Sequence, residues 1–384
     1  MAQLKELVDI YLGVTHTPEY VENGVPFLSV KDISGGKICF DDCKYISEEE
    51  YNGLSQGAKP QVGDMLFCRV GTIGKPIIIP EGTPLFGSFV SLGYLRNRNA
   101  NKCNLEYLRY WMYSKAFERQ VYANVKGASQ VNLNTGWLSK FEVALPDIVV
   151  QEDIVKKLDK CASVINKRKQ ELEELDNLIK SQFVEMFGDP VINPFGWEQV
   201  TLKEVAVGKL SYGSGASATE YDGKCRYIRI TDITDSGELN NDVKSPDKYD
   251  EKYLLQEGDI LFARSGATVG KTFRYSEEKH GKGLYAGYLI RLIPNKEKVI
   301  PDYVFYYTKT EYYASFVKKA QRAVAQPNIN AQEYGDLTIC VPPISLQKEF
   351  MEFVEQVTKL KFEVQKSLDE TQTLMDSLMQ QYFG

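Results

Sequence analysis

Histidine is scarce in this sequence, and no nucleophile or nucleotide motif replaces it. Only His16 and His280 occur among the 384 residues, and no Gly-x-Ser-x-Gly elbow is present. The glycine-rich segments 71–75 and 266–272 place two and three residues between the first Gly and the Gly-Lys, whereas a P-loop requires four. We interpret both segments as turns between strands and expect no catalytic site in this chain.

Long apolar runs and paired cysteines are also missing. No stretch approaches the roughly 18 continuous apolar residues of a membrane span, and residues 1–6 lack the layout of a signal peptide. The seven cysteines are odd in number and scattered, as is typical of reduced thiols. Only Cys39 and Cys43 lie close together, without a second pair or a neighbouring histidine to complete a zinc site. We therefore expect a cytoplasmic protein without a metal site.

An excess of positive charge is absent as well. The formal net charge is -6, which argues against a protein that coats polyanions without selection. Sequence-specific DNA binding is compatible with this charge, because a few Lys and Arg side chains on one face suffice. We therefore expect DNA to contact a local group of Lys and Arg side chains.

Two long stretches, 151–188 and 347–384, repeat apolar residues at steps of 4 and 3. This spacing is the seam of a coiled coil, and neither stretch contains Pro or Gly before its final Phe-Gly. The first predicted seam is Ile154, Leu158, Cys161, Ile165, Arg168, Leu172, Leu175, Ile179, Gln182 and Met186, and the second is Phe350, Val354, Val357, Lys361, Val364, Leu368, Thr371, Met375, Leu378 and Tyr382. We expect the two helices to pair with each other in antiparallel orientation. The alternative is that each packs on its own domain or on a second chain.

The whole sequence is a two-unit internal repeat. Residues 62–75 recur as 257–271 around Gly-Asp-x-Leu-Phe-x-Arg, and residues 130–134 recur as 326–330. Because the order is the same in both halves, each unit is predicted to be a globular domain followed by a long helix. The predicted fold is α+β, with two tandem mixed α/β domains and pseudo-two-fold symmetry. The predicted boundaries are 1–146 for the first domain, 147–188 for its helix, 189–342 for the second domain and 343–384 for its helix.

Short β-rich runs precede a tyrosine-rich helical pattern in both units. The predicted strands are 65–69, 76–79 and 89–95, and then 260–264, 271–275 and 286–292. One amphipathic helix is predicted at 105–120, and its counterpart at 302–319.

The two units differ in length where the repeat is weakest. Gly63 follows Val30 by 33 positions, whereas Gly258 follows Ile230 by 28 positions. No residue pattern is shared between the two units in this region. Two copies that share a scaffold and diverge in one region are typical of two readers of different targets.

Basic residues flank the glycine turn in both units. Arg69 and Lys75 lie on either side of the first turn, and Arg264 and Lys271 on either side of the second. From such turns, cationic side chains are expected to reach phosphates.

Two amide-rich segments, 126–134 and 318–328, combine Lys or Arg with Gln and Asn, side chains that read guanine and adenine edges. The alternative is a structural loop whose Gln and Asn hold backbone groups. Base-reading residues are expected where the units differ, at 35–59, 96–102, 212–229 and 234–252. The predicted DNA-binding residues are Lys31, Arg69, Thr72, Lys75, Arg98, Lys126, Ser129, Gln130, Asn132, Lys224, Arg226, Arg229, Thr231, Arg264, Ser265, Thr268, Lys271, Arg322, Gln326 and Asn328.

These motifs, in this order, resemble the DNA-specificity subunit of type I restriction-modification systems. They are Gly-Asp-Ile-Leu-Phe-Ala-Arg-Ser-Gly at 258–266, Gln-x-Asn-Ile at 326–329, and Pro-Pro-Ile-x-x-Gln-Lys-Glu at 342–349, where the second helix begins. The resemblance covers the whole chain. It implies that each domain is a target recognition domain, that the helices form an antiparallel spacer, and that the chain is not itself an enzyme.

The resemblance also implies the partners. They are double-stranded DNA with an asymmetric bipartite site, two adenine-N6 methyltransferase subunits, and restriction subunits. S-adenosylmethionine, ATP and magnesium would be used by these partner subunits, with no cofactor in this chain. Unequal domains on a helical spacer favour two half-sites roughly one helical turn, about 34 Å, apart. The alternatives are a specificity component of a type IIB-like restriction complex and a coiled-coil adaptor that does not bind DNA.

Overall fold

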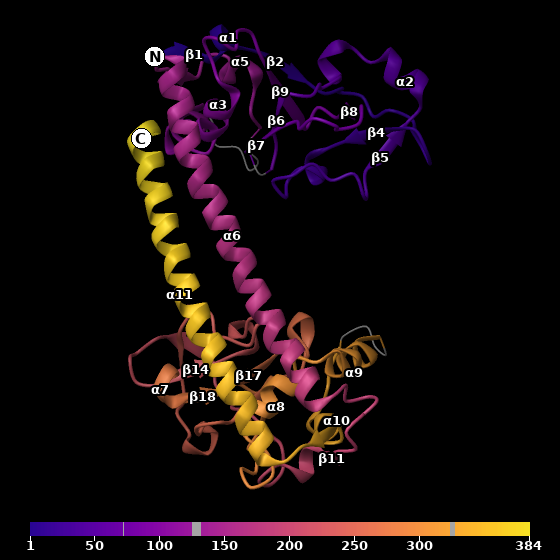
Figure 1. The fold of residues 1–384 in the computed structure, drawn as a ribbon, viewed down its shortest axis with the longest axis vertical. Coiled ribbons are helices and arrows are strands. Elements are labelled where there is room, and N and C mark those ends of the chain that lie inside the picture. Colours follow the sequence, from indigo (N-terminus) through magenta and orange to yellow (C-terminus); the bar gives the residue numbers. More distant parts are fainter. Residues whose placement is uncertain (72, 125–131, 323–326) are drawn as a thin grey trace. The chain divides into compact units, whose positions relative to one another are not determined.

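The computed structural model describes residues 1–71, 73–124, 132–322 and 327–384. It divides into two compact units, of which unit 1 combines Met1–Lys169 with Lys366–Gly384 and unit 2 is Gln170–Gln365. The predicted α+β fold with two tandem mixed domains, each followed by a long helix, is confirmed (Figure 1). None of the described helices combines the length and hydropathy that a membrane span requires.

Unit 1 begins with short strands and ends on a long helix. Its elements before that helix are β1 (Ala2–Gln3), α1 (Leu4–Leu7), β2 (Val8–Leu12), β3 (Tyr20–Val21), β4 (Val25–Leu28), η1 (Val30–Asp32), β5 (Lys44–Ile46), α2 (Glu48–Gly53), η2 (Gln56–Ala58), β6 (Met65–Cys68), β7 (Gly74–Ile78), β8 (Gly87–Ser88), β9 (Leu92–Asn97), α3 (Leu105–Met112), α4 (Lys115–Asn124), α5 (Thr135–Leu138) and β10 (Glu142–Val143). The long helix α6 (Ile148–Phe187) follows.

Unit 2 repeats this order. Its elements are β11 (Glu198–Thr201), η3 (Leu202–Glu204), β12 (Ser211–Tyr212), β13 (Ala218–Glu220), β14 (Arg226–Ile228), η4 (Ile230–Asp232), β15 (Lys244–Pro246), η5 (Glu251–Tyr253), β16 (Ile260–Ala263), η6 (Gly266–Thr268), β17 (Thr272–Arg274), α7 (Glu277–His280), β18 (Gly283–Tyr285), β19 (Leu289–Leu292), α8 (Pro301–Tyr307), α9 (Glu311–Arg322), α10 (Ala331–Gly335) and β20 (Thr338–Val341). The second long helix is α11 (Ile344–Phe383).

Each unit is built on a four-stranded antiparallel sheet, in the order β2-β9-β6-β7 in unit 1 and β12-β19-β16-β17 in unit 2. Side chains alternate between the two faces of a strand. In the central strand β6, Met65 and Phe67 therefore enter a core shared with the helices, whereas Leu66 and Cys68 enter a second core. Strand β16 divides its side chains in the same way. The central strand is buried on both faces and separates two cores.

The second core supports a smaller part of each unit, which we call the distal lobe. It contains β3, β4, β5 and β8 in unit 1, where Figure 1 shows β4 and β5 at the end remote from α6. In unit 2 it contains β13, β14, β15 and β18. The antiparallel pairs β3-β5 and β13-β15 correspond, as do the parallel pairs β4-β8 and β14-β18, but only unit 1 joins the two pairs through a β4-β5 ladder. We call the remainder of each unit the scaffold.

The single helices predicted at 105–120 and 302–319 are wrong, because each is divided in two. Ser114 separates α3 from α4: its Oγ donates to Trp111 O at 2.6 Å and accepts from Phe117 N at 3.3 Å. Thr310 makes the equivalent pair of bonds between α8 and α9. A hydroxyl that caps the next helix in this way ends the preceding one.

The two long helices pack in both units. In unit 1 the start of α6 shares a core with the end of α11, including Leu158 and Phe383. In unit 2 the end of α6 shares a core with the start of α11, and Lys361 Nζ lies 2.5 Å from Asp176 Oδ1. Since both helices are continuous, the two contacts confirm the predicted antiparallel pairing.

The predicted seam is wrong at the end of α6. Phe183 and Phe187 are buried there, whereas the predicted Gln182 and Met186 are only half-buried. The two phenylalanines take these places because Phe183 stacks on Tyr303, with ring centroids 5.5 Å apart, and both contact Phe350.

One fully buried glutamine ties the first turn of each long helix to its own unit. Its Oε1 accepts from a backbone N–H just before α3 or α8, and its Nε2 donates to one carbonyl before that helix and to one after the last strand. The partners are Asn104 N (2.9 Å), Lys102 O (3.0 Å) and Pro146 O (2.8 Å) for Gln151, and Ile300 N (2.9 Å), Lys298 O (3.3 Å) and Pro342 O (2.8 Å) for Gln347. The same three hydrogen bonds therefore fix the start of the long helix in both units.

Candidate nucleic-acid interface

In each unit, the turn after the central strand lies against the amide-rich segment. Val70 pairs with Asn132 in an isolated β-bridge, and Ser265 pairs with Asn328. Two arginines and two asparagines predicted from the sequence are thereby brought together: Arg69 Nη2 donates to Asn132 Oδ1 at 3.2 Å, and Arg264 Nε donates to Asn328 Oδ1 at 3.1 Å. We call residues 69–71, 73–75 and 132–133 the turn site of unit 1, and residues 264–271 and 327–329 the turn site of unit 2.

Glycine is needed where each turn enters the next strand. Gly74 and Gly270 have φ values of 84° and 87°, a region that glycine adopts without steric cost. A Cβ on Gly270 would lie 2.6 Å from a methyl carbon of Val317. Lys75 also has a positive φ, 49°, which disfavours a residue with a side chain. The glycines thus shape the turns and do not form a nucleotide loop.

In the turn site of unit 1 the arginine is held by hydrogen bonds, whereas the lysine side chain has no partner among the residues that the structure describes. Arg69 donates from Nε to Leu133 O at 3.0 Å and from Nη1 to Val90 O at 2.7 Å, in addition to its bond with Asn132. Burial lowers the pKa of this guanidinium. Lys75 Nζ forms no hydrogen bond or ion pair with any described residue, and the side chain lines a cavity of about 460 Å³ with Tyr113.

The turn site of unit 2 has the opposite arrangement. The Arg264 guanidinium lies over the ring of Tyr212, 4.8 Å from its centroid, and no described residue accepts from its Nη atoms. Lys271 Nζ instead lies 3.0 Å from Asp235 Oδ1 and donates to Ile233 O at 3.3 Å. Thr268 turns inward, since its Oγ1 donates to Ser265 O at 3.1 Å.

Neither Tyr212 nor Asp235 was predicted as part of a site. Both fall in the ranges 212–229 and 234–252, where the two units differ and base-reading residues are expected. Nothing in the sequence indicated which residue of those ranges would contact the turn.

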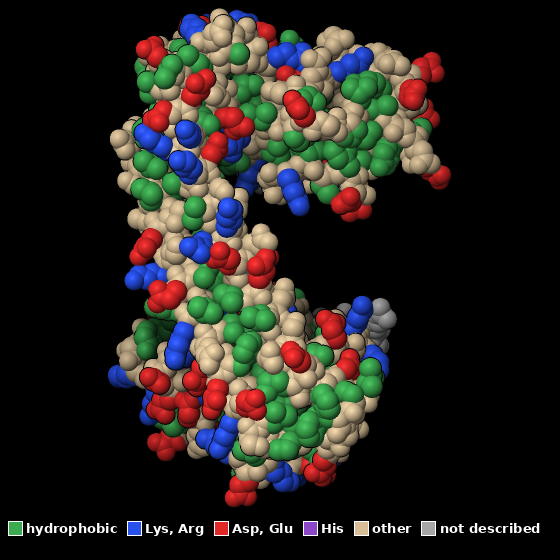
Figure 2. All heavy atoms as spheres, in the orientation of Figure 1, with side chains coloured by type: hydrophobic (Ala, Val, Ile, Leu, Met, Phe, Trp, Pro, Cys, Tyr) green, Lys and Arg blue, Asp and Glu red, His purple; other side chains and the backbone are tan. Residues whose placement is uncertain are grey.

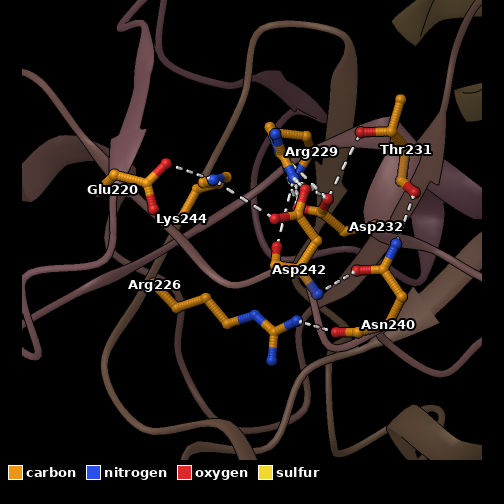
Figure 3. Close-up of polar contacts among 8 residues, drawn as sticks. All are labelled: Glu220, Arg226, Arg229, Thr231, Asp232, Asn240, Asp242 and Lys244. Atoms are coloured by element: carbon orange, nitrogen blue, oxygen red, sulfur yellow. Dashed lines mark hydrogen bonds and ion pairs between the residues drawn. The ribbon is translucent and has the colours of Figure 1, made fainter.

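Three further predicted residues lie in a polar network in the distal lobe of unit 2 (Figure 3). Arg229 donates from Nη2 to Asp232 Oδ1 at 2.5 Å and to Asp242 Oδ2 at 2.8 Å. The hydrogen bond to buried Asp232 is the main cause that raises the pKa of Arg229, and the bond from Arg229 lowers the pKa of Asp242. Lys244 extends the network by lying between Glu220 and Asp242.

Arg226 and Thr231 complete this network. Arg226 donates from Nη2 to Asn240 O at 2.7 Å, while its Nε is buried without a hydrogen-bond partner; burial lowers the pKa of the guanidinium. Thr231 donates to Asp232 Oδ1 at 3.4 Å. A DNA phosphate at Arg229 would have to replace Asp242, because both Asp242 and a phosphate present anionic oxygens to the same fork.

The remaining predicted residues do not gather at one place. Lys31 donates to Asp42 O at 2.8 Å, Arg98 forms a 2.7 Å ion pair with Asp9, Lys224 is exposed, and Arg322 is the last residue of α9. The other predictions, Thr72, Lys126, Ser129, Gln130 and Gln326, lie outside the described residues.

Charge on the surface is mixed. Over the face that Figure 2 shows, basic and acidic side chains intermingle in each unit, and neither unit presents an extended area of one sign there. Within the described ranges, no group of three or more His, Cys, Asp or Glu side chains is placed to hold a metal ion. On this face, contact with a polyanion would therefore depend on individual, well-placed cations.

Known proteins resemble this chain along its whole length. The specificity subunit of the type I restriction enzyme StySPI from Salmonella potsdam is 20% identical over 416 residues, which cover 99% of this chain and 86% of that protein. The EcoKI specificity subunit of Escherichia coli K12 is 19% identical over 410 residues, with the same coverage. The crystal structure of the type I restriction-modification S subunit from M. genitalium has a TM-score of 0.57 at 15% identity and covers 100% of this chain and 95% of its own, which shows a shared fold.

A family model gives the assignment. The model described as the type I restriction modification DNA specificity domain matches residues 2–175 and again residues 194–371. The two matches correspond to the two copies of the sheet, turn site and long helix described above. This chain therefore belongs to the family of type I restriction-modification DNA specificity domains.

Proposed function

We propose that this chain is the sequence-specific DNA-binding subunit of a type I restriction-modification complex and recognises an asymmetric bipartite site. The observation that carries the proposal is that the scaffold contacts recur in both units, whereas the distal lobes share strand pairs and differ in their side-chain contacts. The same buried glutamine and the same sheet order recur in both units. In the distal lobes the β4-β5 ladder of unit 1 has no counterpart, and the Arg229 network occupies unit 2.

A repeated scaffold with two different lobes is suited to reading two different half-sites. Phosphate contacts fix the register of a protein on DNA, whereas contacts to base edges specify the sequence. In our proposal the turn sites, common to both units, supply phosphate contacts, and the distal lobes supply base contacts. The recognised site is then two unlike half-sites separated by a gap that the protein does not read.

The proposal assigns no reaction to this chain. Two adenine-N6 methyltransferase subunits would dock on it and use S-adenosylmethionine, and restriction subunits would use ATP and magnesium for cleavage. A methyltransferase must extrude its target base from the duplex, so this subunit would hold the DNA while another chain performs the chemistry. The complex would act in the cytoplasm.

Methylome sequencing of the source strain tests the function. We expect that deletion of this gene abolishes adenine methylation at one split, asymmetric motif, and that the intact gene restores it. A gene with an early stop codon is the matched control and should restore nothing. If no split adenine motif depends on the gene, the proposal fails.

The purified complex separates the two alternatives. A type IIB-like complex would cut DNA on both sides of the motif, whereas a type I complex requires ATP for cleavage and a non-binding adaptor would retain no DNA. Binding to a duplex that carries the motif, measured at several salt concentrations, should show the steep dependence that phosphate contacts cause.

A further inference from the structure

We propose that the two turn sites contact DNA phosphates through non-equivalent cations, Lys75 in unit 1 and Arg264 in unit 2. Arg69 and Lys271, their respective alternatives within the same turns, are positioning residues that hold each loop in place. This inference rests on the proposed function. It departs from the symmetry of the sequence, in which all four cations stand at matched places.

The two arginines differ in the number of donors they retain. Arg69 uses Nε, Nη1 and Nη2 on three acceptors from two segments of unit 1, and two of these acceptors are backbone carbonyls. Arg264 uses Nε alone and keeps both Nη atoms free of acceptors within the described part of the chain. A guanidinium binds phosphate through a pair of parallel N–H groups. Arg264 retains all four Nη N–H groups for such a pair, whereas Arg69 retains one on each Nη and is held in place by its three internal bonds.

The two lysines differ in the reverse sense. Lys271 pairs with Asp235 and donates to a backbone carbonyl, so its charge is compensated. Lys75 has no such partner among the residues described. Glu118 lines the same cavity as Lys75 but forms no ion pair with it within 4.0 Å. Within the described residues, each turn thus provides one free cation. Arg264 directly follows the strand that enters the turn in unit 2, and Lys75 lies on the strand that leaves the turn in unit 1.

Both free cations are held ready for a ligand. The Tyr212 ring lies 4.8 Å from the Arg264 guanidinium and restricts its motion, which lowers the entropy lost when the fork binds. Lys75 has a backbone φ of 49°, a conformation that costs less free energy for glycine than for a residue with a side chain. Strained backbone of this kind persists where the surrounding structure imposes it, and it occurs often at binding sites.

Four charge-neutralising variants test the assignment: Lys75→Gln, Arg264→Gln, Arg69→Gln and Lys271→Gln. Each is made in the full chain, assembled with its methyltransferase subunits, and its Kd is measured against KCl concentration for a duplex carrying the motif found by methylome sequencing. Lys75→Gln and Arg264→Gln should each reduce the slope of log Kd against log salt by about 0.9, the amount expected for one phosphate contact. Arg69→Gln and Lys271→Gln should leave the slope unchanged and lower the thermal unfolding temperature.

Each variant has a matched control at the equivalent place in the other unit. Conservative variants separate charge from position: Lys75→Arg and Arg264→Lys should keep the wild-type slope. Arg69→Lys keeps the charge but has all its donors on one nitrogen and does not reproduce the planar geometry of the three bonds, so it should lower the unfolding temperature without changing the slope. This variant keeps the test valid if Arg69→Gln does not fold.

The inference is overturned if Arg69→Gln or Lys271→Gln reduces the slope of log Kd against log salt by about 0.9. It is also overturned if Lys75→Gln and Arg264→Gln both keep the wild-type slope. That result differs from failure of the proposed function, in which the wild-type complex itself shows no preference for a split adenine motif. Replacing Tyr212 gives a further check. Tyr212→Ala should weaken binding about threefold at unchanged slope, whereas Tyr212→Phe, which keeps the ring, should bind like the wild type.

Discussion

The scaffold and the distal lobe of each unit differ in how closely their contacts are repeated. In the scaffold, Asp64 and Asp259 open the central strand in both units, where each accepts from an arginine of the neighbouring strand and from a backbone N–H three residues earlier. In the distal lobe, by contrast, the two units share strand partners but few side-chain contacts. The contacts that hold the strands of the four-stranded sheet together therefore recur in both units.

One position shows how the distal lobe varies on a constant backbone. Asp32 and Asp232 both close a capping box, with their Oδ2 atoms accepting from Ser29 N at 2.7 Å and from Arg229 N at 2.8 Å. Ser29 places a small hydroxyl at this corner, whereas Arg229 places a guanidinium that also binds Asp242. The cap keeps the backbone in one geometry, so the side chain is free to differ. This arrangement allows two lobes of related shape to present different chemistry.

The largest effect is expected where the repeated ion pair is buried most deeply. The side chains of Asp259 and Arg291 are 1% and 8% exposed, whereas those of Asp64 and Arg96 are 4% and 27% exposed. Removing one charge leaves the other unpaired, so Asp259→Asn should cost about 3–5 kcal/mol of unfolding free energy and Asp64→Asn about 1–2 kcal/mol. Hydrogen exchange in urea, read separately for each unit, measures both.

An equal cost at the two positions would contradict this prediction, since it would mean that the exposure of the arginine is irrelevant. Burial raises the pKa of Asp259. The comparison is therefore made at neutral pH, and Arg96→Lys with Arg291→Lys serve as paired controls that retain the charge.

The scaffold was more predictable from the sequence than the site. Steps of 4 and 3 over 151–188 and 347–384 predicted both long helices, which begin three residues earlier and end one residue earlier, because a helical seam is a local pattern that survives packing. The break at Ser114 was missed, since a hydroxyl that caps a helix also occurs within one. Arg69 and Arg264 were predicted as equals because their surrounding motifs match. Their difference comes from Tyr212, Val90 and Leu133, which are distant in sequence and meet the turns only in the folded chain.

The second-largest expected effect tests whether the two scaffolds are equally stabilised by their buried glutamines. Gln151→Ala and Gln347→Ala each remove three hydrogen bonds and leave buried backbone groups without partners, which should cost about 2–4 kcal/mol in either unit. Because the partners correspond one to one, the two costs should agree within about 0.5 kcal/mol, the usual limit for independent sites. Unit-resolved hydrogen exchange measures them.

The exposed neighbours Glu152 and Lys348 provide the controls for these two variants. Their replacement by alanine should change stability by less than about 0.5 kcal/mol. A cost confined to one unit would show that only one long helix depends on its glutamine, despite the matching geometry.

The smallest effect concerns a half-buried lysine of unit 2 at a place where unit 1 has a tyrosine. Lys309 follows α8 at the place that Tyr113 takes in unit 1, and its ammonium lies 4.6 Å from the centroid of the Phe305 ring. Burial lowers its pKa from 10.5 to about 8; Lys180 and Lys271 act in the same direction, and Asp235 and Glu238 oppose them. Below pH 8 the lysine is charged in both the folded and the unfolded chain, so the full cost of burying the charge is present.

As the pH rises from about 8 toward 10.5, the folded chain releases this proton first, the unfolded chain holds more protons, and stability increases. Lys309→Met should therefore raise the unfolding free energy at pH 7 by about 1–2 kcal/mol, after allowance for the partial exposure of the side chain. The gain should fade between pH 8 and pH 10 in urea titrations. Lys279→Met, at an exposed lysine of the same unit, should show neither the gain nor the pH dependence. A gain that persisted at pH 10 would mean that better packing of methionine, and not removal of a buried charge, distinguishes unit 2 from unit 1 at this place.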